Sequence, residues 1–121
     1  MKKITEKMAT AFKAAQACKV GNSEVRRTDC LIVLYLHGNR IAWRNPDSNF
    51  LHVTCAGWNT YTTRERLNGL LSVLSLPFFF RQKKGDCQLV DSKAGIVFTD
   101  ASNETYLINT SMHKVTPYSN I

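Results

Sequence analysis

The chain has 121 residues, 44% of them hydrophobic, and its 16 Lys and Arg against 9 Asp and Glu give a formal net charge of +7. This length and composition suit one globular domain with its own core, and they exclude a chain that is disordered throughout. No stretch has the roughly 18 consecutive apolar residues of a membrane-spanning helix, and the N-terminus lacks the apolar segment of a signal peptide.

The cysteines indicate neither a metal site nor disulfides. Cys18, Cys30, Cys55 and Cys87 lie far apart, without a C-x-x-C pair or zinc-type spacing to a histidine. Because nothing indicates secretion, we expect reduced thiols in a cytoplasmic setting, with no metal, no cofactor and no membrane contact.

The positive charge is concentrated in residues 1–84. This segment holds fourteen Lys and Arg and five acids, a balance of +9, whereas residues 85–121 hold two Lys and four acids, a balance of −2. A basic body favours the binding of a polyanion. The alternative is that the charge serves solubility alone.

Residues 4–18 are expected to form an amphipathic helix. Apolar side chains recur at helical spacing on one face and lysines occupy the other. Gly21 and Asn22 follow and are typical of a helix end. The lysine face is either solvated or a contact for phosphate groups.

An antiparallel meander of three strands is expected next, at residues 30–36, 40–44 and 50–55. The first is an unbroken apolar run typical of a buried central strand, and the third alternates between apolar and polar residues. Gly38-Asn39 predicts a two-residue hairpin turn between the first two strands. In that register His37 pairs with Arg40 at the tip.

A second helix is predicted by the capping-box pattern of Thr62 and Glu65, with Thr62 as the N-cap. Leucines at helical spacing form its core face, and Pro77 requires the helix to end by Leu76. Further short strands are expected at residues 78–82, 87–90, 95–99 and 105–109, the first two joined in a hairpin around residues 83–86.

These elements predict an α+β fold, in which an antiparallel sheet of five to seven short strands is packed by two amphipathic helices. Because the strands are short and consecutive, an SH3-like or partly open barrel is an alternative. We expect residues 1–109 to form one globular domain, with 1–84 as the basic body and 85–109 as extra strands. Residues 110–121 are expected to be a polar C-terminal tail.

The N-terminus of the second helix is the predicted site for an anion or a nucleic acid. Its free N–H groups and its dipole attract anions, and Arg64 and Arg66 lie in its first turns. Alternatively, both arginines only border the core with their aliphatic stems. Trp58 suits stacking on unpaired bases, although a loop tryptophan commonly covers the core instead. The predicted site residues are His37, Asn39, Arg40, Trp58, Thr62, Thr63, Arg64, Arg66, Arg81, Lys83 and Lys84.

No catalytic arrangement is evident. The sequence has no G-x-S-x-G elbow, Walker loop or H-E-x-x-H pattern, and nothing in it places Cys30 or Cys55 beside a histidine. We therefore expect a protein that is not an enzyme. A small enzyme would need the fold to bring an acid or a nucleophile to His37.

Two segments resemble a group of small, largely uncharacterised tailed-bacteriophage proteins. Their pattern is L-H-G-N-x-I-A followed by G-W-x-T-x-T-T-x-x-R-L-N, carried here by Leu36-His37-Gly38-Asn39, Ile41-Ala42, Gly57-Trp58, Thr60, Thr62-Thr63 and Arg66-Leu67-Asn68. The resemblance covers roughly residues 1–84, and the residues after Gly85 look like an extension. It implies a phage-encoded accessory protein in the cytoplasm of the infected bacterium, and it implies no reaction or ligand.

The basic patches and the resemblance together favour a non-enzymatic, nucleic-acid-binding phage protein. The alternative is a host-takeover or anti-defence protein that binds a bacterial protein or sequesters a nucleotide signal. In either case the predicted partner is a nucleic acid, a host protein or a nucleotide.

Overall fold

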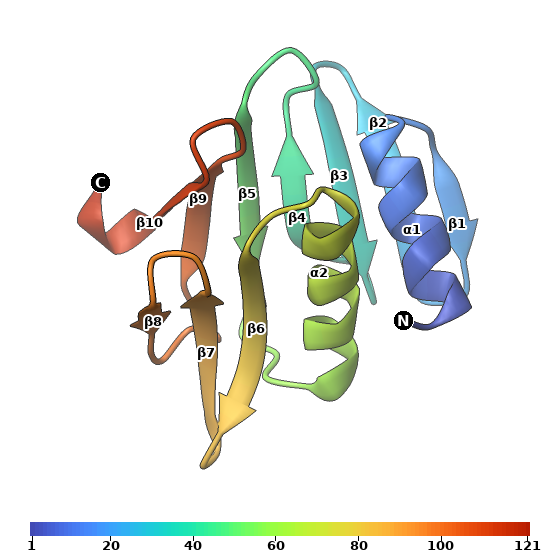
Figure 1. Ribbon diagram of the computed structural model, residues 1–121. Coiled ribbons are helices and arrows are strands. Elements are labelled where there is room, and N and C mark those ends of the chain that lie inside the picture. The colour runs from blue at the N-terminus through green and yellow to red at the C-terminus, as the bar shows by residue number, and fades with distance from the viewer.

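The computed structural model describes residues 1–121 and has two α-helices, ten strands and a short 3-10 helix (Figure 1). In chain order the elements are α1 (Lys3–Lys13), β1 (Cys18–Val20), β2 (Ser23–Thr28), β3 (Leu31–Leu36), β4 (Asn39–Arg44), β5 (Phe50–Thr54), α2 (Tyr61–Val73), β6 (Phe78–Lys83), β7 (Asp86–Asp91), β8 (Ile96–Phe98), β9 (Thr105–Asn109), β10 (Lys114–Pro117) and η1 (Tyr118–Asn120). Neither α-helix is long and apolar enough to cross a membrane.

The strands form two antiparallel sheets. The large sheet has the order β1-β2-β3-β4-β5-β9-β10, and the small sheet has the order β6-β7-β8. Both α-helices and the small sheet pack on one face of the large sheet, and the opposite face is uncovered (Figure 1). The predicted α+β class is confirmed. The barrel alternative is wrong, because the large sheet stays open with β1 and β10 as its edges.

Alternation along the strands places the core between the two layers. Leu34 of β3 and Tyr106 of β9 point toward the helices and the small sheet, and both are 1% exposed. The predicted leucine face of α2 is confirmed, since Leu67, Leu70 and Leu71 are completely buried. Burial of this set of side chains is the main stabilising contribution to the fold.

The β3–β4 hairpin turns one residue earlier than predicted. Leu36 pairs with Asn39, so His37 and Gly38 are the two turn residues, with φ angles of 51° and 78°. The predicted His37–Arg40 pair is therefore wrong. A two-residue turn of this hand needs positive φ at both positions, and histidine is among the residues that tolerate it.

A β-bulge follows in β4. Tyr35 pairs with Arg40 and Leu34 pairs with Ala42, which leaves Ile41 as an extra residue. Ile41 and Ala42 both stay in the core. Arg40 and the residues paired with it therefore face the uncovered side of the sheet.

The first helix ends earlier than predicted. It stops at Lys13, where the Arg44 guanidinium donates to the carbonyls of Phe12 at 2.9 Å and Lys13 at 3.1 Å. Gly21 and Asn22 instead form the turn between β1 and β2, two strands that no sequence pattern indicated. Cations at a helix C-terminus satisfy carbonyls that have no partner in the helix.

The C-terminal residues extend the large sheet. β9 pairs with β5, and β10 pairs with β9 from Lys114 to Pro117. The expected polar tail at residues 110–121 thus contains an ordered edge strand. The predicted hairpin of β6 and β7 is confirmed, with Lys84 and Gly85 as its turn residues.

Candidate functional site

A pocket of about 280 Å³ lies where the β3–β4 hairpin meets the N-terminus of α2. It brings together the two segments that the sequence singled out, although about twenty residues separate them along the chain. Its lining residues are Leu36, His37, Asn39, Ile41, Trp58, Thr60, Thr62 and Thr63. Five of the predicted site residues are therefore neighbours.

The start of α2 supplies one wall of this pocket. Thr60 is the N-cap, and its Oγ1 accepts from the backbone N–H of Thr63 at 3.2 Å. The predicted cap at Thr62 is wrong, because Thr62 lies within the first turn, where its hydroxyl stays available to the pocket. The first N–H groups of the helix have no partner within it, so this wall attracts acceptors and anions.

A tight loop presents Trp58 beside this wall. Ala56 and Gly57 have φ angles of 53° and 84°, and the Trp58 N–H donates to the carbonyl of Cys55 at 2.9 Å. A Cβ on Gly57 would lie 3.0 Å from Asn103 Oδ1, in a strained backbone conformation. The indole is 56% exposed, so Trp58 does not cover the core.

His37 forms the opposite rim of the pocket. Its backbone N–H donates to the carbonyl of Asn22 at 2.8 Å, and its Nε2 lies 3.2 Å from the side-chain amide of Asn22. The β1–β2 turn thereby fixes the position of the β3–β4 tip. Asn39 lines the pocket next to this tip and brings a side-chain amide to it.

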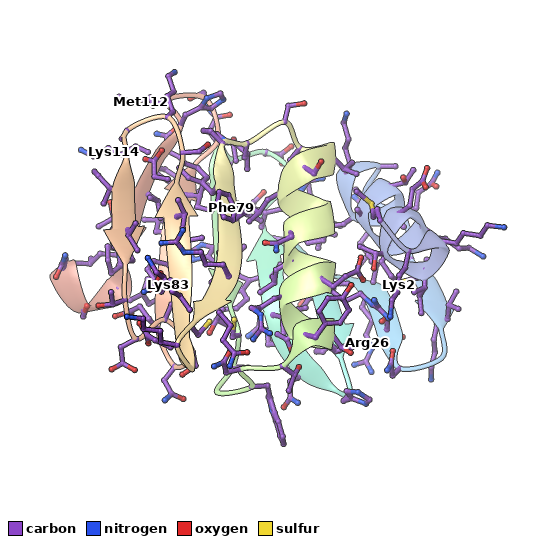
Figure 2. The ribbon with its side chains drawn as sticks, turned by 60° about the horizontal axis from the view of Figure 1, so that its bottom comes forward. Lys2, Arg26, Phe79, Lys83, Met112 and Lys114 are labelled. Carbon is purple, nitrogen blue, oxygen red and sulfur yellow. The ribbon has the colours of Figure 1, made fainter.

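Asn59 connects the Trp58 loop to the small sheet. Its amide accepts from the Arg64 guanidinium and donates to the carbonyl of Gly85 at 3.2 Å. Arg64 also donates to Gln82 Oε1 at 3.1 Å. The bond to Gly85 ties the tip of the β6–β7 hairpin, which carries the exposed Lys83 and Lys84, to the Trp58 loop (Lys83 is labelled in Figure 2).

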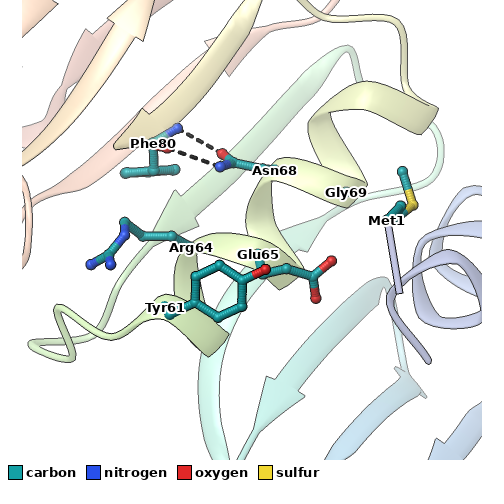
Figure 3. Close-up of a pocket in the computed structure, with 7 residues that line it drawn as sticks. All are labelled: Met1, Tyr61, Arg64, Glu65, Asn68, Gly69 and Phe80. Carbon is teal, nitrogen blue, oxygen red and sulfur yellow. Dashed lines mark hydrogen bonds between the residues drawn. The ribbon is translucent and has the colours of Figure 1, made fainter. Parts of the chain in front are cut away.

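A second pocket, of about 370 Å³, lies on the other side of α2 between the helix, Met1 and β6 (Figure 3). Asn68 anchors β6 there, since it donates to the Phe80 carbonyl at 2.8 Å and accepts from the Phe80 N–H at 2.7 Å. Arg64 and Tyr61, from the first turn of α2, line this second pocket, so the Arg64 charge belongs to it and not to the lining of the first pocket.

Arg66 has a different environment from the one expected. It is 6% exposed, and it donates to Thr5 Oγ1 at 2.8 Å, to Ser23 Oγ at 3.1 Å and to Glu65 Oε1 at 2.6 Å. It therefore joins α2 to α1 and β2 and is turned away from the pocket. Burial raises the pKa of Glu65, but hydrogen bonds from Thr5 and the Lys2 N–H, together with the Arg66 charge, lower it below its ordinary value.

Two further predicted residues also lie away from the pocket. Arg40 points to the uncovered face of the large sheet, where its guanidinium lies 4.9 Å from the centroid of Trp43. Arg81 donates to Gln88 Oε1 at 2.9 Å on the outer face of the small sheet. Cross-strand pairing explains Arg40, since it lies opposite Tyr35 on the face that points away from Asn39 and Ile41.

Sequence reasoning missed Thr60 and Asn59 as parts of the site. The available signal for Thr60 was its position three residues before Thr63, the spacing at which an N-cap hydroxyl meets an N–H. For Asn59 no sequence signal existed, because its partner Gly85 lies 26 residues away, in the turn between β6 and β7.

The pocket lining contains no carboxylate and no thiol. Cys55 lies beneath the Trp58 loop with its sulfur 3.8 Å from that of Cys87, and both side chains are buried. The hydrogen bond to Cys87 and burial raise the pKa of the Cys55 thiol, which therefore stays protonated. The groups in this pocket are suited to hydrogen bonding and stacking.

Comparison with known proteins shows the family. The sequence model of the Kyanoviridae Gp96 protein matches residues 1–112. No curated protein and no solved structure matches the chain. The match runs from α1 through β9, so the segment after Gly85 is included in it rather than being an extension. The chain therefore belongs to the Kyanoviridae Gp96 protein family, a family of phage proteins.

Proposed function

We propose that this phage protein binds single-stranded nucleic acid, without acting on it chemically, in the cytoplasm of the infected bacterium. The observation that carries the proposal is the pocket at the N-terminus of α2, which has an exposed tryptophan on its rim and cations beside it. The cations linked to the Trp58 loop are Arg64, whose guanidinium donates to Asn59, and Lys83 and Lys84, whose hairpin turn accepts from Asn59 at the Gly85 carbonyl.

The pocket size suits one base. Its volume of about 280 Å³ is just below the range of roughly 300–1,000 Å³ that is usual for sites of small organic ligands. Trp58 offers a flat face for stacking, and the Asn39 amide with the Thr62 hydroxyl offers donors and acceptors for the edge of a base. The flanking lysines would contact the phosphates outside the pocket.

The proposal is tested by fluorescence anisotropy with labelled single-stranded DNA and RNA, at low and moderate salt. We expect binding that weakens steeply with salt, and we expect Trp58→Ala to weaken it about 5- to 150-fold, since stacking on one base contributes about 1–3 kcal/mol. Met112→Ala is the matched control, because Met112 is a large, exposed side chain in the turn between β9 and β10 (Figure 2).

No binding to any single-stranded oligonucleotide would overturn the proposal. Equal affinity of the wild type and Trp58→Ala for these oligonucleotides would show that the pocket does not contribute to nucleic-acid binding. Preference for double-stranded over single-stranded DNA would also contradict it, because paired bases offer no free face to Trp58.

A second candidate, binding of a host protein, is favoured by an apolar row on the outer face of the small sheet. Phe79 pairs with Val90, which pairs with Val97, and Phe79 and Val97 are 38% and 42% exposed (Phe79 is labelled in Figure 2). Exposed apolar rows of this kind mark protein contacts. The test is a pull-down from nuclease-treated bacterial lysate. Capture of one bacterial protein by the wild type and by Trp58→Ala, but not by Phe79→Ser, would support this candidate.

A further inference from the structure

The uncovered face of the large sheet carries a continuous set of aromatic and cationic side chains. Cross-strand pairing places one row on it, from β2 to β10: Arg26, Val33, Trp43, His52, Leu107 and Thr116. Tyr35 and Arg40 form the neighbouring pair toward the hairpin tip. Neither helix nor the small sheet packs on this face (Figure 1).

The planar groups in this set stack on one another. Trp43 and His52 are parallel within 4°, with ring centroids 5.2 Å apart, and the Arg40 guanidinium lies 4.9 Å from the Trp43 ring. The Arg26 guanidinium lies 4.6 Å from the Tyr35 ring. Aromatic rings and guanidinium planes are the groups on which unpaired bases stack in single-strand-binding proteins.

Contacts within the protein hold these aromatic and cationic side chains, called the platform below, in place before any ligand binds. Val33 points to this face and yet is 1% exposed, since the large side chains of Arg26 and Trp43 flank it at the paired positions. Tyr118 of η1 packs edge-on against His52 at 5.7 Å, and its hydroxyl hydrogen-bonds to Nδ1 of the imidazole. Side chains held in this way lose little conformational entropy when a ligand stacks on them.

The net positive charge of this face favours an anionic ligand. Lys19, Arg26, Arg40 and Lys114 occupy strand positions on it against one carboxylate, Glu24, which is 3.1 Å from Arg26. A second copy of the chain would bring two cationic faces together. A polyanion with flat, unpaired groups complements both the charge and the shape.

The face is continuous with the pocket already described. His37 lines that pocket and also a depression of about 270 Å³ on the other side of the hairpin tip, which Tyr35 and Arg26 share. Asn39 faces the pocket and the next residue, Arg40, faces the platform. A strand with one base in the pocket can therefore continue around the tip.

We infer that this platform, Arg26, Tyr35, Arg40, Trp43 and His52, is a second contact for the same single-stranded nucleic acid; the inference rests on the proposed function. From β2 to β5 three strand spacings of about 4.8 Å span about 14 Å. That is the length of roughly four stacked nucleotides at about 3.4 Å each. A short oligomer fills the pocket alone, and a longer one also covers the platform.

The test compares oligothymidylates of roughly 4 and 12 nucleotides, a short and a long length within the common range of single-strand site sizes. We expect Arg26→Gln/Arg40→Gln to weaken binding of the longer oligomer about tenfold and to leave the shorter one within about twofold. Lys3→Gln/Lys7→Gln is the matched control, since it removes the same charge from the exposed face of α1.

A second readout uses the tryptophans, of which the chain has two. In a Trp58→Phe variant, Trp43 is the only tryptophan, and we expect the longer oligomer to quench its fluorescence while the shorter one does not. If the longer oligomer binds without quenching Trp43 and without sensitivity to Arg26→Gln/Arg40→Gln, the inference is wrong and the proposed function stands. If neither oligomer binds, both fail. A dimer that Arg40→Gln dissociates would show that a second copy occupies the face, which also overturns the inference.

Discussion

His52 lies at the centre of the uncovered sheet face, between Trp43 and Tyr118. Burial and the charge of Arg40 lower its pKa below the ordinary value. The Tyr118 hydroxyl hydrogen-bonds to Nδ1 of the imidazole. Because burial and the Arg40 charge both disfavour the protonated ring, the neutral imidazole is the form that this environment stabilises.

This environment predicts the pH dependence of stability. In the unfolded chain a histidine has a pKa of about 6.5. Because the folded-state pKa of His52 lies below that, the unfolded state binds more protons as the pH falls below about 6.5. The free energy of unfolding should then decrease until the pH reaches the folded pKa.

Urea unfolding of the wild type and of His52→Gln at pH 7.5 and 5.5 measures this effect. We expect the wild type to lose more stability than the variant between the two pH values, because only the wild type protonates His52 on unfolding. The same loss in both proteins would show that His52 contributes nothing to the pH dependence.

At the scale of elements, the contact between α1 and α2 depends on Gly69. A Cβ at this position would lie 2.1 Å from Thr5 Cγ2 and 3.4 Å from Met1 Sδ. The hydroxyl of this Thr5 side chain accepts a hydrogen bond from the Arg66 guanidinium at 2.8 Å. The close approach of the helices therefore positions Thr5 for the buried polar network of Arg66 and Glu65.

We expect Gly69→Ala to destabilise the protein by about 1–3 kcal/mol, the usual cost of overpacking a core. In an unobstructed helix the same change would stabilise by up to about 1 kcal/mol. Thr5→Ser removes Cγ2 and keeps the hydroxyl, so the double variant should recover part of the loss. Thermal unfolding measures both.

Ser72→Ala is the control for Gly69→Ala, because Ser72 is exposed on the same helix. It should change stability by less than about 0.5 kcal/mol. A neutral Gly69→Ala, or a double variant with no recovery, would show that the helices separate easily and that the contact is not tight.

At the scale of the whole molecule, the charge is unevenly distributed over two faces and one end. Lys83 and Lys84 lie at the tip of the small sheet, while Arg26 and Arg40 lie on the uncovered face of the large sheet (Lys83 and Arg26 are labelled in Figure 2). Lysines of α1 occupy a third, exposed surface. Variants that remove charge from one surface at a time can therefore show which of the three surfaces binds phosphate groups.

The dependence of affinity on salt tests this assignment. For single strands, the slope of log K against log salt is about −0.7 per phosphate neutralised. We expect Lys83→Ala/Lys84→Ala to reduce the magnitude of the slope by about 1.4, and Lys3→Ala/Lys7→Ala to leave it unchanged. Equal reductions in both variants would indicate a general charge effect without a defined binding surface.

The sequence by itself determined the class of the fold and most of its elements. Apolar periodicity predicted both helices and the strands of β3 to β9, because each pattern reports which side of an element is buried. The resemblance in residues 36–42 and 57–68 also predicted a phage protein, and the family match confirms that much. Local chemistry was sufficient for these features.

Only the tertiary structure decided how these elements combine. The turn at His37 and Gly38 paired Arg40 with Tyr35 on the uncovered face of the sheet, and burial against Thr5 and Ser23 removed Arg66 from the pocket. Strand pairing assembled the platform from residues of β2 to β5, which no local pattern connects. Register and side-chain burial depend on contacts between distant segments, and the periodicity of one segment carries no information about its partner.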